Sequence, residues 1–421
     1  MSFVKAIGIL LIVALIQAGG TLSSRAAGTD PSVSDSARLL LVHYMPWFES
    51  PPVSKKWGWH WTMNHYDPSQ IRDGRSEIAS HYRPFIGPYD SSDPDLVECH
   101  ALLMKFAGID GAVIDWYGCD DYNDYGQNHR NTLLFIDALK RAGLRYTVMY
   151  EDQTVPRLIE GNRVAAADRI AHGQKVMAWM CDHWFSDPAF LRVKARPAFM
   201  VFGSGYYSGD DWVRIFAGFD PLPALFTESL VRGPAAGAFD WPQPGKGTDA
   251  GLAETIRFDG ENEAGTYRIP TAFPRFHDIY KEAGNQPSWG EIDDRDGQTY
   301  RETLSAALRA GTDFVQIATW NDWGEGTQIE PSIEFGFRDL EATLESSRAF
   351  LHPNLPFSAA DLRLPIALYR LRKHPEEAGE EKTKLDSIAN LLFEGKTLEA
   401  RKELGKTDVF DRLKMPDDAN R

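Results

Sequence analysis

A chain of 421 residues is too long for one ordinary domain, but it fits a single α/β barrel with an appendage. Its formal net charge of -15 argues against a nucleic-acid partner, because phosphate binding requires a basic surface. Apolar residues make up 43 % of the chain and charged residues 25 %, as expected of a globular protein with a large core.

The N-terminal segment 1–26 has the pattern of a secretory signal peptide. Lys5 provides the basic region, an apolar run follows at 6–18, and Ala26 suits the cleavage site. The apolar run is shorter than the roughly 20 residues that span a membrane, and no second run of that length follows in the sequence. We therefore expect a secreted or periplasmic protein without stable membrane insertion. We also expect it to be a monomer.

Short β-rich runs alternate with helical stretches over residues 36–352, which is the pattern of repeated βα units. Eight units favour a closed (β/α)8 TIM barrel over an open doubly wound sheet. The expected strands lie at 38–44, 111–116, 145–150, 197–202, 224–227, 237–241, 271–276 and 314–320. Helices are expected between them, among others at 94–106, 131–142, 165–182 and 298–310.

The composition changes after residue 352. A charged stretch at 374–384 precedes an amphipathic helical stretch at 385–404, which is expected to be a helix packed on the barrel. The predicted organisation is therefore a signal peptide, a catalytic barrel and a small C-terminal helical appendage at 353–421.

Acidic and aromatic residues gather at the ends of the predicted strands, where α/β barrels place their active sites. Aromatic faces stack on sugar rings, and polar side chains bind sugar hydroxyls, so these residues predict a glycan-binding cleft. Some of the tryptophans are expected instead to pack beneath their loop, and a lone histidine is more often structural. The predicted substrate-binding residues of the first seven strands and their loops are Tyr44, Trp47, Trp59, His60, Asp115, Trp116, Tyr150, Glu151, Glu228, Asp240 and His277.

The sharpest local pattern is ATWNDWGEGTQIEP at 318–331. Asp322 and Glu325 are three residues apart just beyond the last strand, and two close carboxyls can hold different protonation states. Glycoside hydrolysis needs such a pair, one acid protonated and the other ionised. An acidic turn that caps the strand is the alternative. We predict Asp322 and Glu325 as catalytic residues and, beside them, substrate-binding Trp320, Asn321 and Trp323.

The segment Trp320 to Pro331 resembles the strand-eight motif of glycoside hydrolase family 99, the endo-α-mannosidase type. The opening HYMPWFESPPVSKKWGWHW at 43–61 is similar to the first-strand loop of that family, and GIDGAVIDWYG at 108–118 and the pair Tyr150 and Glu151 are similar to its second and third strand ends. The resemblance covers most of residues 38–350 and implies an endo-acting α-glycosidase.

In that family the second acid of the strand-eight motif is the general acid/base, which corresponds to Glu325. The first acid assists the sugar 2-hydroxyl in attacking the anomeric carbon, with net retention. Asp322 takes this position with a side chain one methylene shorter than the usual glutamate. The same string also resembles the inverting α-1,3-glucanases of family 71, so the sugar and the stereochemistry stay open. A catalytically silent glycan-binding barrel is a further alternative.

No metal and no cofactor are expected. The acidic loop 120–124 lacks the pattern of a complete calcium loop. The sequence also lacks a Gly-rich phosphate loop, a G-x-S-x-G nucleophile elbow and a paired-Cys zinc site. Cys99, Cys119 and Cys181 permit at most one disulfide. The expected partner is an α-linked oligo- or polysaccharide.

Overall fold

The computed structural model describes residues 38–72, 74–260, 266–373 and 382–405. The predicted signal peptide lies outside the described residues, as do most of the charged stretch at 374–384 and the last residues of the tail.

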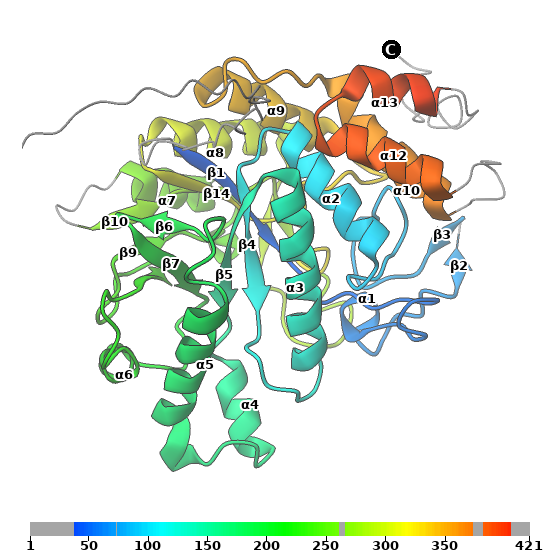
Figure 1. The fold of residues 1–421 in the computed structure, drawn as a ribbon. Helices are drawn as coiled ribbons and strands as arrows, with labels where there is room; N and C mark the ends of the chain where they lie inside the picture. The colour runs from blue at the N-terminus through cyan, green and yellow to red at the C-terminus, as the bar shows by residue number, and fades with distance from the viewer. Residues whose placement is uncertain (1–37, 73, 261–265, 374–381, 406–421) are drawn as a thin grey trace, which may run out of the picture. The chain divides into compact units, whose positions relative to one another are not determined.

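Parallel strands close into a barrel (Figure 1). They are β1 (Leu39–Tyr44), β4 (Gly111–Trp116), β5 (Arg145–Tyr150), β7 (Arg196–Val201), β8 (Ala224–Glu228), β9 (Gly237–Phe239), β10 (Tyr267–Ile269), β11 (Thr271–Ala272) and β14 (Phe314–Ile317). Their order is β10-β9-β8-β7-β5-β4-β1-β14-β11. β10 and β11 are consecutive segments of one barrel position, and because β10 pairs with β9 while β11 pairs with β14, this position closes the sheet. The predicted TIM barrel is confirmed.

The seventh barrel position differs from the predicted strand at 271–276. It begins at Tyr267 and is interrupted at Pro270, which has no N–H to donate to a neighbouring strand. The last predicted strand residues leave the barrel, because β12 (Phe276–His277) pairs antiparallel with β13 (Glu291–Ile292). His277 therefore lies on a separate hairpin.

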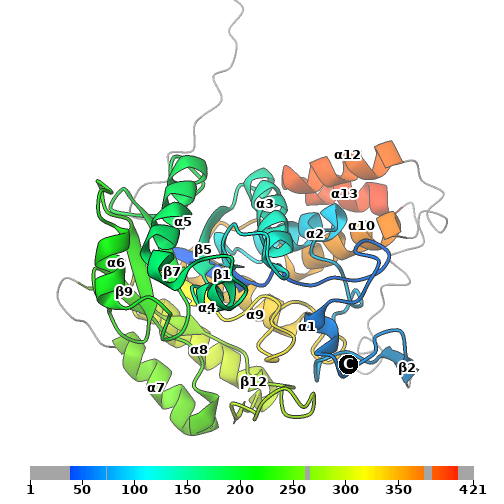
Figure 2. The same ribbon diagram turned by 90° about the horizontal axis from the view of Figure 1, so that it is seen from below.

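Helices follow most of the strands and surround the barrel, as the view in Figure 2 shows. Asp93 caps the first of them by accepting a hydrogen bond from the Asp95 N–H, and Pro94 occupies the first turn, so this helix begins where predicted. The surrounding helices are α2 (Pro94–Phe106), α3 (Tyr125–Ala142), α4 (Thr154–Glu160), α5 (Arg169–His183), α6 (Gly209–Ile215), α7 (Thr248–Gly260), α8 (Gln298–Arg309) and α9 (Arg338–Phe350).

Short elements occupy the connections. They are α1 (Trp59–Thr62), the hairpin β2 (Ile71–Arg72) with β3 (Arg75–Ser76), β6 (Arg192–Val193), and the 3-10 turns η1 (Ala166–Asp168), η2 (Pro244–Lys246), η3 (Arg295–Gly297) and η4 (Ala359–Arg363). The α1 turn lies in the long loop after β1, so this tryptophan-rich loop is folded.

The C-terminal helices α10 (Leu364–Lys373), α12 (Lys382–Phe393) and α13 (Thr397–Leu404) pack together, and α10 contacts α2. Arg372 pairs with Asp95 at 2.8 Å and with Glu98 at 3.1 Å, and Lys373 pairs with Asp93 at 2.6 Å. These contacts join the end of α10 to the start of α2. The boundary of the appendage at residue 353 stays a prediction.

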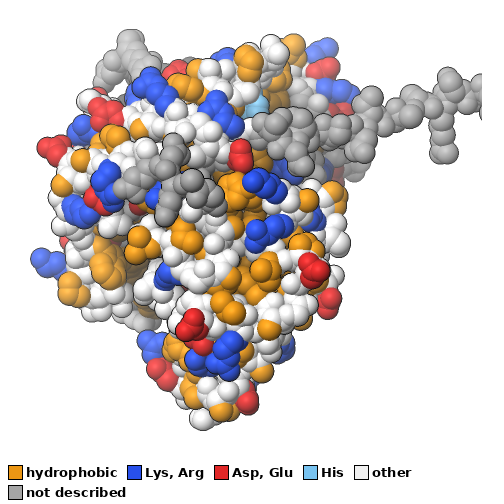
Figure 3. Space-filling model, turned by 90° about the vertical axis from the view of Figure 1, so that its left-hand side faces the viewer, with side chains coloured by type: hydrophobic (Ala, Val, Ile, Leu, Met, Phe, Trp, Pro, Cys, Tyr) orange, Lys and Arg blue, Asp and Glu red, His pale blue; other side chains and the backbone are white. Residues whose placement is uncertain are grey.

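The described surface is mixed in charge on the face shown in Figure 3, where Lys and Arg side chains are interspersed with Asp and Glu. Within the described ranges, no helix combines the length and the apolar character needed to cross a membrane. Cys99, Cys119 and Cys181 are all free, and Cys99 is buried.

Candidate active site

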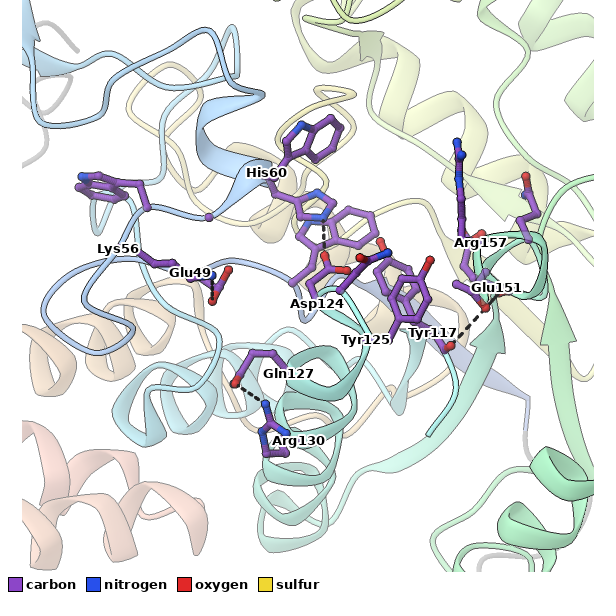
Figure 4. Close-up of a pocket in the computed structure, with 17 residues that line it drawn as sticks. Glu49, Lys56, His60, Tyr117, Asp124, Tyr125, Gln127, Arg130, Glu151 and Arg157 are labelled. Carbon is purple, nitrogen blue, oxygen red and sulfur yellow. Dashed lines mark hydrogen bonds and ion pairs between the residues drawn. The ribbon is translucent and has the colours of Figure 1, made fainter. Parts of the chain in front are cut away.

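The strand ends surround a cleft that has an inner and an outer part. The inner pocket has a volume of about 200 Å³ and is lined by both predicted catalytic acids, while the outer cavity has a volume of about 1000 Å³ (Figure 4). Four residues line both parts, namely Trp47, His60, Tyr117 and Glu151. The two cavities therefore form one continuous cleft at the end of the barrel where the active site was predicted.

The loop after β14 carries the two catalytic candidates and folds back on itself. The Thr319 N–H donates to the Thr327 carbonyl at 3.0 Å, and the Ile329 N–H donates to the Thr319 carbonyl at 3.0 Å. Gly326 has a φ of +70°, and a Cβ at this position would lie 2.7 Å from the His277 carbonyl oxygen. Only glycine fits this turn without strain, so Gly326 allows the sharp turn directly after Glu325.

Asp322 and Glu325 lie close together at the inner pocket. The Glu325 N–H donates to Asp322 Oδ1 at 3.0 Å, and the Tyr280 hydroxyl donates to Glu325 Oε1 at 3.5 Å. Glu325 Oε2 is buried and has no hydrogen-bond partner. Burial raises the pKa of Asp322 to about 6, and burial together with the charge of Asp322 holds the pKa of Glu325 well above its usual range. Near neutral pH Asp322 is thus ionised while Glu325 keeps its proton.

Two further carboxyls line the inner pocket. Asp115 is 4 % exposed at the end of β4, and its Oδ1 has no hydrogen-bond partner. Burial and the neighbouring Glu151 hold the pKa of Asp115 well above its usual range, and burial with Asp152 raises the pKa of Glu151 to about 8. The pocket thus brings four acids to one place, two more than hydrolysis requires.

Aromatic rings line the cleft where the two parts meet. The Trp47 ring stacks on His60 with centroids 4.2 Å apart, and His60 Nε2 lies 3.8 Å from Asp124 Oδ2. Burial lowers the pKa of His60 in spite of this carboxylate. Trp59 is 38 % exposed and borders the outer cavity. The arrangement gives flat apolar faces beside polar atoms, which suits sugar rings.

Comparisons with known proteins agree with this geometry. The model of Glycosyl hydrolase family 99 matches residues 36–221. Glycoprotein endo-alpha-1,2-mannosidase of Rattus norvegicus is 24 % identical over 330 residues, which cover 69 % of this chain and 67 % of that protein. The family 99 endo-alpha-mannosidase structure from Bacteroides thetaiotaomicron superimposes with a TM-score of 0.55 at 20 % identity, covering 75 % of this chain and 96 % of that chain.

These comparisons indicate a glycoside hydrolase that is similar to family 99. A relative from Homo sapiens, the glycoprotein endo-alpha-1,2-mannosidase-like protein, is 23 % identical over 336 residues and covers 70 % of this chain and 68 % of its own. The resemblance drawn from the sequence motifs is thereby confirmed, and the substrate of the chain is a glycan. The match to the family model ends before the strand-eight motif, so the roles of Asp322 and Glu325 stand on the motif and on the geometry.

Several predicted substrate-binding residues lie on the side of the barrel that faces the surrounding helices. Tyr44 stacks on Phe135 of α3 at 3.7 Å and contacts His100 of α2. Trp116 donates its ring N–H to His129 of α3 at 3.1 Å, and Tyr150 lies beside it. Trp320 packs against the same His100. These four side chains are core residues between the barrel and its helices, and none of them lines the described pockets.

Asn321 and Trp323 are buried and hold the strand-eight loop. Asn321 Oδ1 accepts the Met45 N–H at 2.8 Å, and the Asn321 amide donates to the Tyr89 hydroxyl at 3.1 Å. The Trp323 ring N–H donates to the same hydroxyl at 3.0 Å, and Tyr89 in turn donates to Glu330 at 2.7 Å. Both residues therefore position the strand-eight loop and do not line the described pockets.

Three other predicted residues lie near the cleft but do not line the described pockets. Glu228 accepts the Gly203 N–H at 2.8 Å, and burial raises its pKa. Asp240 is buried, and its charge acts on Asp259 of α7. His277 stacks on His81 at 3.7 Å, and its N–H donates to the Glu325 carbonyl at 2.8 Å. His277 thus supports the strand-eight loop through its backbone.

The inner pocket also contains residues absent from the predicted set. Three of them are sequence neighbours of predicted residues, namely His43, Tyr117 and Trp241. Successive side chains of an extended chain point to opposite sides, so these three face the pocket. Their predicted neighbours Tyr44, Trp116 and Asp240 do not. A correct assignment of inward and outward positions could have found them. Met45, Phe202 and Tyr280 complete the lining. Tyr280 follows β12, which lies outside the barrel, so no barrel-strand pattern could indicate it.

Proposed function

We propose that this chain cleaves internal α-glycosidic linkages of a mannan-like glycan, with Glu325 as general acid/base and Asp322 as its partner carboxylate. The proposal rests chiefly on one observation: these two acids lie together in the inner pocket and are held in different protonation states. The outer cavity continues from this pocket and provides room for neighbouring sugars, as an endo-acting enzyme needs. The endo-α-mannosidase names of the relatives supply the choice of sugar.

The chemistry follows from the two protonation states. Glu325 gives its proton to the glycosidic oxygen as the bond between that oxygen and the anomeric carbon breaks. Asp322 accepts the proton of the sugar 2-hydroxyl, whose oxygen attacks the anomeric carbon and forms a 1,2-anhydro sugar. Glu325, now ionised, then takes a proton from water, and the water oxygen opens the anhydro ring while Asp322 returns its proton. The anomeric configuration is retained.

Release of reducing sugars from a panel of α-mannans and α-glucans tests this proposal. Glu325→Gln is expected to lower turnover at least about a hundredfold, because the side chain loses its acid. Glu345→Gln is the matched control, since Glu345 is exposed on α9 and does not line the described pockets. Wild-type activity in Glu325→Gln would contradict the role of Glu325. Glycan binding without any sugar release would indicate a binding barrel.

The anomer of the first product tests the proposed route. Retention predicts that NMR shows the α-anomer at the new reducing end before mutarotation. A β-anomer as the first product would contradict the attack by the 2-hydroxyl and would place a water molecule between Asp322 and the sugar. We also propose that residues 1–26 direct export, which is tested by removing them and measuring the enzyme outside the cell.

A further inference from the structure

Two exposed tryptophans lie on loops at the cleft end of the barrel. All 12 tryptophans of the chain fall within the described ranges, and only Trp59 and Trp289 are exposed, at 38 % and 58 %. Trp59 follows β1 and borders the outer cavity. Trp289 lies between β12 and β13, in the connection that follows the seventh barrel position. Such connections lie at the end of a parallel barrel that carries the active site, but the proposed chemistry gives Trp289 no role.

The strand order places the two tryptophans on opposite sides of the inner pocket. The outer cavity is lined by residues that follow β1, β4 and β5, which are three adjacent barrel positions. The backbone beside Trp289 packs closely on the loop after β9, where a Cβ on Gly290 would lie 2.4 Å from the Pro244 carbonyl oxygen. β9 lies four positions from β4 in both directions around the barrel. In Figure 2, β12 and α7 accordingly lie on the side away from α3 and α5.

Asp278 fixes Trp289 to the segment that touches Glu325. The buried Asp278 carboxylate accepts the Tyr280 N–H through Oδ1 at 3.2 Å and the Trp289 N–H through Oδ2 at 2.8 Å. Tyr280 lines the inner pocket, and its hydroxyl donates to Glu325. The Trp289 backbone is therefore held beside the pocket while its side chain is exposed. A binding group that is already in place loses little conformational entropy when a ligand packs on it.

The role proposed for Glu325 determines which part of the substrate lies on this side. In the proposed route Glu325 protonates the glycosidic oxygen, which leaves with the sugars on the reducing-end side of the broken bond. Glu325 lines the inner pocket but not the outer cavity, and its carboxyl contacts Tyr280. A leaving group on the Glu325 side extends toward Tyr280 and Trp289, away from the outer cavity.

We propose that Trp289 is a stacking platform for a sugar of the leaving group, so that the protein binds its glycan on both sides of the cleaved bond. This inference rests on the proposed function and specifies its substrate as a chain that continues on the reducing-end side. One face of a pyranose ring carries mostly C–H groups, and an indole ring can bury that face while the hydroxyls stay in water. Trp289 offers such a surface, and Trp59 offers one on the opposite side.

The position of the cleaved bond tests the proposal. The probes are α-1,2-, α-1,3- and α-1,6-linked manno-oligosaccharides of two to six sugars with a fluorescent label at the reducing end. The length of the labelled product gives the number of sugars in the leaving group. We expect Trp289→Ala to lower kcat/KM about tenfold for bonds whose leaving group contains two or more sugars. Cleavage of the longer probes should therefore shift toward the reducing end.

Two further variants show whether the shift comes from the aromatic ring at this place. Trp289→Phe keeps an aromatic face and should retain most of the wild-type bond preference. Trp59→Ala is the matched control, because it removes the same side chain on the opposite side, and it should shift cleavage toward the non-reducing end. An unchanged pattern in Trp289→Ala, or a shift toward the non-reducing end, would overturn the inference. An equal fall at every bond, as a purely structural role would produce, would also contradict it.

Binding measurements separate this inference from the proposed function. If wild type cleaves none of the probes, the proposed function is contradicted, and fluorescence polarisation of the six-sugar probes then tests the platform alone. About tenfold weaker binding to Trp289→Ala than to wild type would support the platform, whereas equal affinity would overturn it. Cleavage that depends on Glu325, with the same bond preference in wild type and Trp289→Ala, would keep the hydrolase and overturn the inference.

Discussion

The two proposed catalytic acids differ in pKa because their surroundings differ. Asp322 is buried, but the backbone N–H groups of Glu325 and Gly324 oppose the effect of burial, so its pKa rises only to about 6. In the proposed route Asp322 accepts a proton from the sugar, so it must be ionised first. We therefore expect kcat/KM to rise with pH through about 6, and Asp322→Asn to lower it at least about a hundredfold. A pH–rate profile measured on wild type checks this, and a flat profile between about pH 5 and 7 would contradict it.

Tyr280 is a neutral group that opposes the high pKa of Glu325. Its hydroxyl donates to Glu325 Oε1 and so favours the ionised carboxylate. Tyr280→Phe should raise the pKa of Glu325 further, which moves the alkaline limb of the rate profile to higher pH, and should lower kcat about tenfold. Tyr66→Phe serves as a control, since Tyr66 does not line the described pockets. An unchanged alkaline limb would show that this contact does not act on Glu325.

The strand-eight loop depends on one phenol. Tyr89 is 2 % exposed, accepts hydrogen bonds from Asn321 and Trp323, and donates one to Glu330. Tyr89→Phe leaves these three groups without their partner inside the fold, so we expect a loss of about 1–3 kcal/mol in the free energy of unfolding. Chemical denaturation measures it. Stability equal to wild type would indicate that water replaces the hydroxyl.

Elements with strong local signals could be predicted from the sequence. β4 and β5 have the predicted bounds, and α2 follows its Asp93 cap and Pro94. The seventh barrel position could not be read in this way, because its two short segments are defined only by their pairing with β9 and β14. The residues of the candidate site were likewise predictable only in part, because tertiary packing decides which of them face the pocket. The position of the strand ends was predictable, but which neighbour faces the pocket depends on the helices packed outside.

At the scale of the whole molecule, buried acids link stability to pH. Asp240 and Asp259 face each other between β9 and α7, and burial raises their pKa values to about 6 and about 8. A carboxyl whose pKa is higher in the folded state than in the unfolded state binds protons more strongly when folded. Its contribution to stability is therefore present at low pH and is lost as pH rises from about 4 to about 8. The four acids of the inner pocket act in the same direction.

Replacement of one acid of this pair should reduce the pH dependence. Asp259→Asn keeps the shape of the side chain but never ionises, so we expect it to raise the free energy of unfolding at pH 8 by about 1 kcal/mol or more and to change it little near pH 4. Urea unfolding at both pH values measures the difference, with exposed Asp121→Asn as the control for net charge. Equal effects at the two pH values would mean that folding does not raise the pKa of Asp259. In that case the loss of stability on raising the pH would have to come from the acids of the cleft, and ligand binding there would remove it.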